Sequence, residues 1–277
     1  MERLGDDMRA NFSALMTALL VVVLAGGAGA GSKVIDIRPV TVPDYIGFGI
    51  GGAPEYPGAD EYTAGAAPVA RYSWGNRYID LQGNYVALNL VDDARWHAGP
   101  AALLRFGRKD PEDAVVDRLD DVDRSLDLGA FVSYVHADPD EPRDRWVVAA
   151  DIAQDVTGAH SGATVSAALR KWFALGDYGL FGLSLGSSYG SGEYMDTYFS
   201  VTPKGEAASG LAAFKAGSGV RDVSITATIV QPISRTWVVG GGAMYTRLLG
   251  DAADTPITDD RGSPDQVIFG LGIARIF

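Results

Sequence analysis

The sequence contains no cysteine among its 277 residues and only three histidines. Without thiols the chain has no disulfide framework, no thiolate metal site and no cysteine for lipid attachment. Few histidines also leave few candidates for a base in nucleophilic catalysis. The fold must therefore be held by its own backbone pairing and packing, and we expect no cofactor.

Basic residues are scarce as well, because 23 lysines and arginines stand against 35 acids and give a formal net charge of −12. Nucleic acids bind through clustered lysine and arginine, so this balance argues against a nucleic-acid partner. The chain beyond residue 30 also lacks a run of roughly 18 apolar residues, the length that a spanning helix needs. A crossing of a membrane would have to use strands.

One apolar segment near the N-terminus has a different character. Arg9 precedes an apolar core over about 14–24, and the small residues Ala28-Gly29-Ala30 follow in an A-x-A arrangement. This is the pattern of a secretory signal peptide, and its core is shorter than the roughly 20 residues of a membrane span. We predict a signal at 1–30, cleaved after about residue 30, and one domain at 31–277.

Alternation of apolar with small or polar residues recurs through the mature chain. In DVSITATI, the large apolar residues fall on one side and Asp, Ser and Thr on the other, as the period of two in a strand requires. Eleven segments follow this pattern, at 44–53, 64–73, 79–87, 97–107, 126–134, 147–155, 163–173, 179–188, 222–229, 237–247 and 265–277. We predict a twelfth strand at 194–202, which is rich in β-formers although its alternation breaks at Tyr198-Phe199.

The C-terminal segment carries the strongest indication of a membrane barrel. VIFGLGIARIF alternates large apolar with small residues and ends on Phe277, as the closing strand of an outer-membrane barrel would. Arg275 lies in the apolar register, where its stem can lie along lipid. We predict an all-β fold, a transmembrane antiparallel up-and-down β-barrel of about 12 strands in contact with outer-membrane lipid. A barrel of 10 strands and a soluble β-sandwich are the alternatives.

Tryptophans and long polar segments bear on the same prediction. Tryptophan favours the membrane–water interface, and all five tryptophans lie at or close to predicted strand ends, namely Trp74, Trp96, Trp146, Trp172 and Trp237. Surface loops are predicted at 108–125, 203–218 and 248–264. A count of twelve strands places 108–125 on the periplasmic side, although long loops normally face outwards.

The candidates for catalysis and metal binding are weak. His160 and Ser161 are adjacent in the turn TGAHSG, with Asp155 five residues ahead. Neighbouring residues on one turn rarely reach each other as base and nucleophile, so we expect a polar hairpin loop. The acidic stretch 110–123 lacks the glycine and terminal glutamate of an EF-hand, which favours a solvated loop over a calcium site. We predict that the protein is not an enzyme.

Several charged residues fall on the polar face of the predicted strands. The residues that would face the lumen include Asp80, Arg105, Asp127, Asp151 and Asp222. Such groups either line a narrow pore or pair with each other and plug it. The sequence leaves both alternatives open, so a small channel or solute-responsive pore stays beside a non-catalytic interaction protein.

Several longer stretches resemble the MipA/OmpV family of outer-membrane proteins. They are APEYPGADEY, AGPAALLRFGR, LDLGAFVSY, EYMDTYFSVTP, GVRDVSITATI and, above all, TRLLGDAADTPITDDRGSPDQ at 246–266. The resemblance covers essentially the whole mature chain, but the turn at 136–145 is longer and more charged than the family pattern.

This resemblance implies an outer-membrane scaffold for cell-wall synthesis, one that joins a lytic murein transglycosylase to a bifunctional penicillin-binding protein. It brings no catalytic residues. We take the loop 248–264 and the turn near 54–63 as candidate partner-binding surfaces, with Asp251, Asp254, Asp259, Asp260 and Arg261 as the charged residues of the first.

Overall fold

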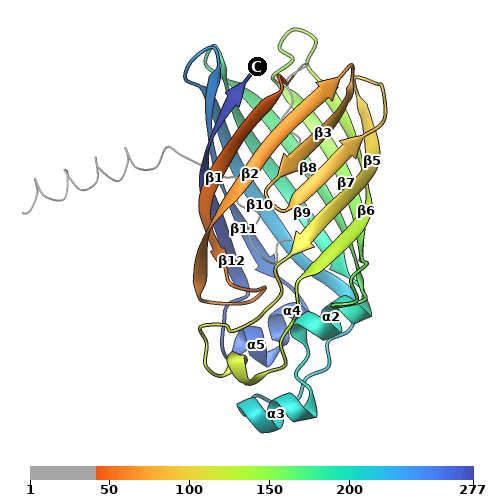
Figure 1. Ribbon diagram of the computed structural model, residues 1–277, viewed down its shortest axis with the longest axis vertical. Coiled ribbons are helices and arrows are strands. Elements are labelled where there is room, and N and C mark those ends of the chain that lie inside the picture. The colour runs from red at the N-terminus through yellow and green to blue at the C-terminus, as the bar shows by residue number, and fades with distance from the viewer. Residues whose placement is uncertain (1–41) are drawn as a thin grey trace, which may run out of the picture.

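The computed structural model describes residues 42–277 and shows a closed barrel of twelve antiparallel strands, each paired with its neighbours in sequence and β1 paired with β12 (Figure 1). The strands are β1 (Tyr45–Pro54), β2 (Tyr62–Trp74), β3 (Arg77–Gln82), β4 (Tyr85–Asn89), β5 (Trp96–Arg105), β6 (Ser125–Ala137), β7 (Arg145–Asp155), β8 (Ala163–Leu175), β9 (Gly179–Gly190), β10 (Gly219–Pro232), β11 (Trp237–Leu248) and β12 (Asp265–Ile276). The predicted fold class and strand number are confirmed. The predicted signal at 1–30 lies outside the described residues.

The period of two decides which side chains face outwards. On β10, Val223 and Ile225 are exposed on the outer wall, whereas Ser224 and Thr226 are buried inside. On β1, Ile46 and Phe48 are 61% and 58% exposed. Large apolar side chains are exposed on the outer wall along most of the strands. Their exposure would be unfavourable in water, but it suits a wall that lies in lipid.

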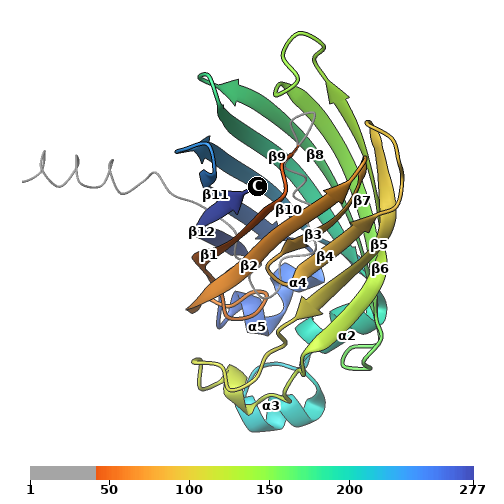
Figure 2. The same cartoon turned by 45° about the horizontal axis from the view of Figure 1, so that its top comes forward.

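The two ends of the barrel differ in the length of their connections (Figures 1 and 2). One end, called the turn end here, carries the short connections 75–76, 90–95, 138–144, 176–178 and 233–236, together with Tyr45 and the C-terminus. The other, called the loop end, carries 55–61, 106–124, 156–162, 191–218 and 249–264.

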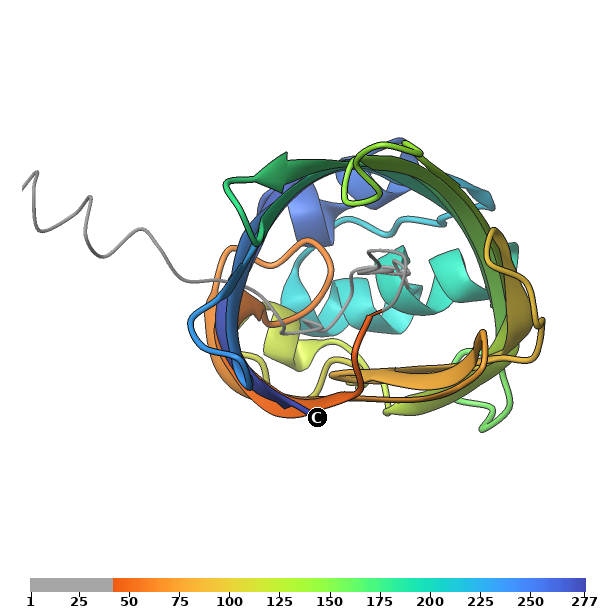
Figure 3. The ribbon, with the colours of Figure 1, turned by 90° about the horizontal axis from the view of Figure 1, so that it is seen from above.

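The loop end contains all the helices of residues 42–277. They are the 3-10 helix η1 (Val116–Arg118) and the α-helices α2 (Gly192–Phe199), α3 (Pro203–Ser209), α4 (Asp251–Asp254) and α5 (Pro256–Asp259). In the described chain, no helix combines the length and the apolar character needed to cross a bilayer. Seen along the barrel, the helices lie across the end of the lumen (Figure 3).

The predicted strand 79–87 is wrong, because it is two strands. β3 and β4 flank a tight turn at Gly83-Asn84, where Gly83 has a φ of +60°. The turn reverses the chain, so Tyr85 lies opposite Gln82 and faces the lumen instead of the lipid. Alternation continues across the turn in the sequence, and it therefore conceals the reversal.

The predicted strand 194–202 is also wrong, because residues 192–199 form helix α2. The Ser191 hydroxyl accepts a hydrogen bond from the Tyr194 backbone N–H and caps the helix. Tyr194, Met195, Tyr198 and Phe199 are all buried. Their spacing is that of one helical face, so the break in alternation at Tyr198-Phe199 marked a helix.

The two errors cancel in the count of strands, but they change the position of the first long loop. Because β3 and β4 are separate strands, loop 106–124 lies at the loop end with the other long connections. The prediction that 108–125 lies on the opposite side of the barrel from the other long loops is therefore wrong.

The tryptophans all lie near the turn end, but they do not share one environment. Trp74, Trp96, Trp146 and Trp237 are between 40% and 52% exposed on the outer wall, where an interfacial ring would lie. Trp172 is fully buried inside the barrel. The guanidinium carbons of Arg145 and Arg170 lie 5.5 and 5.8 Å from its ring centroid, which gives the ring cationic neighbours.

Candidate functional site

The five charged residues predicted for the lumen are all buried on the inner wall. Asp127 is fully buried, and Asp80, Arg105, Asp151 and Asp222 are each at most 7% exposed. The structure does not bring them into one network. They lie in separate places on the wall, and Arg105 is bonded to Asp127.

The first place is a cluster around Asp127 near the loop end. Arg105 Nε on β5 donates to Asp127 Oδ2 on β6 at 2.6 Å, and Arg105 Nη2 donates to the Thr164 hydroxyl on β8 at 2.8 Å. The Ser125 hydroxyl donates to Asp127 Oδ1 at 2.8 Å. A buried charge needs such partners, so this cluster joins three strands across the lumen.

His160 completes this cluster from the loop 156–162. Its Nδ1 accepts from the Gly162 N–H at 3.1 Å, so Nε2 carries the proton toward Asp127 Oδ1, 3.2 Å away. Both ring nitrogens are therefore engaged, and His160 is not a free base for Ser161. The loop was predicted as polar and hairpin-like, but this imidazole is buried.

Asp127, Asp155 and His160 also place three possible metal-ligand atoms within 4.8 Å of one another. The oxygens of Asp155 already accept hydrogen bonds from the backbone N–H groups of Thr157, His160 and Ser161 at 2.7–2.8 Å. Asp127 is neutralised by Arg105. These bonds shape the loop and account for the two carboxylates without a metal ion.

The second place is the β-bulge at Arg221. The β9–β10 register shifts between Val220 and Asp222, so Arg221 and Asp222 both face inwards. Arg221 Nη2 donates to Asp222 Oδ2 at 2.7 Å, and Nη1 donates to the Tyr194 hydroxyl on α2 at 2.6 Å. This bond ties α2 to the wall. Arg221 was missed in the sequence, although two charged neighbours within a strand were a sign of a bulge.

The remaining lumen acids lie closer to the turn end. Asp80 Oδ1 accepts from the Tyr45 hydroxyl at 2.8 Å, and Arg71 Nη1 lies 3.7 Å from its Oδ2. Asp151 on β7 lies opposite Ser166 of β8. The lumen of the described barrel therefore carries braces of opposite charge at several heights, a pattern that stiffens a barrel.

Two of the five residues predicted for partner binding, Asp251 and Arg261, are bonded to other segments of the loop end, and of the five only Asp251 is half-buried. Asp251 Oδ2 accepts from the Gly217 backbone N–H at 2.7 Å. Arg261 is paired with Asp113 of loop 106–124 through its Nε and Nη2, at 3.1 and 2.5 Å from one carboxylate oxygen. Asp254, Asp259 and Asp260 are exposed.

The pair Asp113–Arg261 connects two loops that are 148 residues apart in sequence. The other oxygen of Asp113 accepts from the backbone N–H groups of Val115 and Val116 and so begins η1. Burial alone would raise the pKa of Asp113, but the hydrogen bonds from Arg261 and the two amides outweigh it and lower the pKa. The acidic stretch 110–123 is thus not simply solvated.

We expect Arg261→Gln to loosen the loop end at neutral pH, because Asp113 loses its charged partner. Proteinase K should then cut loop 106–124 several-fold faster than in the wild type, an increase that corresponds to about 1 kcal/mol of local stability. Arg247→Gln is the control, since Arg247 pairs with Asp265 at an exposed position on the outer wall. Equal cutting of both variants would contradict a specific role for Arg261.

Acid should act on the same pair. Because the folded pKa of Asp113 is lowered, its contribution is complete above the ordinary aspartate pKa of about 3.9 and is lost as the pH falls through the lower folded value. Hydrogen exchange of 106–124, corrected for intrinsic rates, should therefore rise in the wild type only below about pH 4. In Arg261→Gln it should already be high at pH 6.

A closed barrel of antiparallel strands with an apolar outer wall and a charged lumen defines the protein as an outer-membrane β-barrel. The chain belongs to the MipA family, described as MltA-interacting protein MipA, which matches residues 46–277. No curated protein matches the chain.

Three solved structures resemble this chain at low sequence identity. The COG4313 outer membrane channel from Pseudomonas putida F1 is 14% identical, with 89% of this chain and all of that chain covered and a TM-score of 0.44. OmpT of Vibrio cholerae is 8% identical, with 89% and 100% covered and a TM-score of 0.38. The Pseudomonas putida toluene transporter TodX is 8% identical, with 91% and 74% covered and a TM-score of 0.33.

Proposed function

We propose that the protein is a non-catalytic scaffold of the outer membrane that holds a lytic murein transglycosylase and a bifunctional penicillin-binding protein at its periplasmic face. Membership of a family named for its interaction with MltA supports the first partner. The buried charges support the absence of catalysis, because Arg105, Asp127, His160 and Asp155 are engaged in structural bonds. Export through the signal predicted at 1–30 would deliver the barrel to the outer membrane.

The observation that carries this proposal is the contrast between the two ends. Outer-membrane barrels have short periplasmic turns and longer external loops, so we assign the turn end to the periplasm, where murein enzymes act. The loops at the other end bind each other, as the Asp113–Arg261 pair and the bond from the Ser263 N–H to the Gly58 carbonyl illustrate. On this assignment the candidate loop 248–264 faces outwards, and the turns become the favoured binding surface.

The turn end offers an ordered, acidic surface. Connection 138–144 holds its shape because the Asp138 carboxylate accepts from the Asp140 N–H at 2.8 Å and Glu141 pairs with Arg143. Arg143 Nη1 also donates to the Gly176 carbonyl at 3.1 Å, which links this turn to the next. A pre-organised surface loses little entropy on binding, and its acids suit a basic patch on a periplasmic partner.

Charge reversal at the turn end tests the scaffold. We expect Asp140→Lys with Asp177→Lys, both exposed, to weaken binding of the folded protein to the purified transglycosylase about tenfold or more, because rim charges act on association. The control is Asp254→Lys with Asp260→Lys at the loop end, which should bind as the wild type does. Binding is measured by surface plasmon resonance in detergent, with the penicillin-binding protein as a second analyte.

Two results would contradict the proposal in different ways. If the folded wild type binds neither enzyme, the scaffold function is wrong. If the loop-end variant loses binding and the turn-end variant keeps it, the scaffold stands but our assignment of the binding face is wrong.

A further inference from the structure

The barrel wall is incomplete between β2 and β5. β2 contains 13 residues, but the hairpin beside it is short, with 6 residues in β3 and 5 in β4. β2 pairs with β3 only from Val69 to Trp74, and β4 pairs with β5 at three positions. In the described chain, the remaining segment 62–67 of β2 pairs only with β1.

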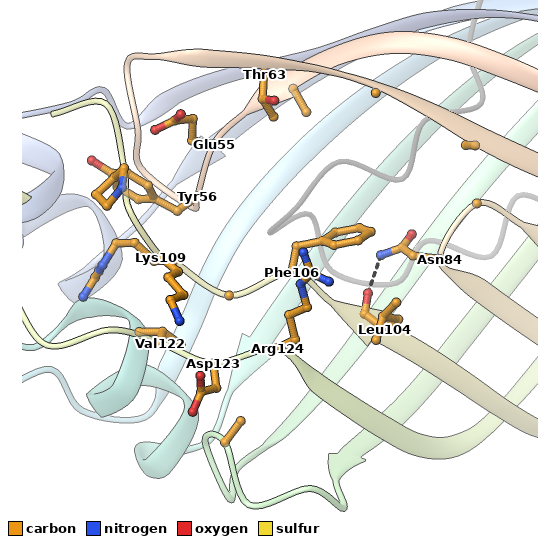
Figure 4. Close-up of a pocket in the computed structure, with 18 of the residues that line it drawn as sticks. Glu55, Tyr56, Thr63, Asn84, Leu104, Phe106, Lys109, Val122, Asp123 and Arg124 are labelled. Carbon is orange, nitrogen blue, oxygen red and sulfur yellow. Dashed lines mark hydrogen bonds between the residues drawn. The ribbon is translucent and has the colours of Figure 1, made fainter. Parts of the chain in front are cut away.

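The hairpin tip defines the upper margin of this opening. The Gly83 N–H donates to the Pro68 carbonyl at 2.8 Å, and the Leu104 N–H donates to the Asn84 carbonyl at 2.9 Å. The Asn84 side chain adds a bond to the Leu104 carbonyl at 2.7 Å (Figure 4). From this tip toward the loop end, no strand of residues 42–277 lies between β2 and β5.

A cavity of about 1280 Å³ occupies this opening. Its lining includes every β2 residue from Thr63 to Pro68. Thr63, Gly65 and Ala67 face the lumen, whereas Ala64 and Ala66 face the lipid, by the alternation of the strand. Since both faces of β2 line one cavity, the cavity passes around the strand edge and connects the lumen with the outside of the wall.

The opening lies in the half of the apolar band next to the loop end. Tyr62 begins β2 at the level of that end, and Trp74 ends it among the interfacial tryptophans of the turn end. The six residue-to-residue steps from Tyr62 to Pro68 correspond to roughly 20 Å of strand. With the loop end outside, this is the outer leaflet of the membrane.

Among residues 42–277, no strand pairs with the edge of β2 that borders the opening. The Pro68 carbonyl points to the β3 side, and alternate residues of a strand point the same way, so the N–H and C=O groups of Ala64 and Ala66 do too. Exposed backbone groups are not tolerated in hydrocarbon unless they border a polar or water-filled space. The opening therefore suits an occupant that brings polar groups as well as an apolar body.

The opposite margin combines apolar and cationic side chains. Leu104 and Phe106 are each 40% exposed, and Arg124 extends alongside Phe106 (Figure 4). Lys109 and Arg124 are exposed and form no ion pair within the described chain. Glu55 and Asp123 also line the cavity, but Glu55 accepts a hydrogen bond from the Glu112 N–H.

We propose that this lateral opening admits single-chain anionic amphiphiles from the outer leaflet into the barrel lumen, with Leu104 and Phe106 against the apolar chain and Arg124 and Lys109 against the anionic end. The helices across the loop end leave the side of the barrel as the route from that leaflet (Figure 3). This inference does not rest on the scaffold function.

Binding of doxyl-labelled stearate to the folded protein in phosphatidylcholine nanodiscs tests the opening. We expect an immobilised component in the spin-label spectrum beyond that of phosphatidylcholine carrying the same label. Gly65→Phe should reduce the affinity at least about tenfold, because no heavy atom lies within 4 Å of a Cβ added at Gly65 and the ring can fill the cavity. Ala167→Phe, on the lipid face of β8, is the control and should bind as the wild type.

A second pair of measurements tests the cations and keeps the proposal falsifiable if Gly65→Phe does not fold. Lys109→Gln with Arg124→Gln should weaken stearate about fivefold or more but leave its methyl ester unchanged, since only the acid carries a charge. A wild type without the extra immobilised component would overturn the proposal, as would equal binding by Gly65→Phe. Loss of acid and ester alike in the double variant would overturn the role of the two cations.

Discussion

Gly129→Val is expected to prevent closure of the barrel. Gly129 lies on the inner face of β6, opposite Ala153 of β7. A Cβ at this position would lie 1.8 Å from the carbonyl oxygen of Ile152, which belongs to the backbone of the neighbouring strand. A side chain can be accommodated only if β6 and β7 separate, and this would break pairing in the middle of the wall. We expect a loss above about 4 kcal/mol, in the range of exceptional substitutions.

The shift in gel mobility of an unheated sample relative to a heated one reports whether the barrel has formed. Wild-type protein refolded into detergent should show the shift, and Gly129→Val should not. Ala130→Val is the matched control, because the next residue faces the lipid and a larger apolar side chain is favourable there. A Gly129→Val protein with a normal shift and normal unfolding midpoint would refute the close approach.

The second large effect concerns Asp127. Asp127→Ala removes the carboxylate that accepts a hydrogen bond from the buried Arg105 at 2.6 Å. It also removes the acceptor that His160 and Ser125 share. Breaking a buried pair from one side costs about 3–5 kcal/mol. We expect a fall of this size in the free energy of unfolding, measured by urea titration of tryptophan fluorescence in lipid vesicles.

Two further variants test whether the loss of stability in Asp127→Ala comes from the broken charge pair. Asp127→Asn keeps an acceptor oxygen and should fall between Asp127→Ala and the wild type, because the charge is lost but a hydrogen bond to Arg105 can remain. Asp123→Ala changes an exposed acid of the same segment and should alter stability by less than about 0.5 kcal/mol. Equal stability of Asp127→Ala and Asp123→Ala would show that the Asp127 cluster does not hold the lumen together.

The sequence predicts which side of the barrel wall a side chain faces better than it predicts which residues that side chain contacts. Alternation correctly assigned Asp222, Ser224 and Thr226 to the inner wall, because a strand has a fixed period and lipid demands an apolar exterior. It could not reveal the turn at Gly83-Asn84, where two strands read as one, because both follow the same pattern. The helical spacing of Tyr194 and Tyr198 was present in the sequence, but aromatic residues also favour strands.

The grouping of the lumen charges lay beyond sequence reasoning for a geometric reason. An inward-facing position fixes neither the height of a residue in the barrel nor its place around the circumference. Arg105 pairs with Asp127 on the next strand, whereas Asp80 on β3 lies opposite Arg71 of β2. The pairing of Asp113 with Arg261 depends on how two loops meet. The local sequence of either loop contains nothing that specifies the other.

The seam between β1 and β12 has a consequence for the order of folding. It places Tyr45 opposite Ile276, so the last pairing joins the two ends of the described chain. Gly58 and Gln266, 208 residues apart, meet just beyond that seam. Contacts of such long sequence separation form slowly, since the loop entropy is lost before they are gained. In a refolding time course, protection of the long loops from amide hydrogen exchange should therefore appear last, after β1 has paired with β12.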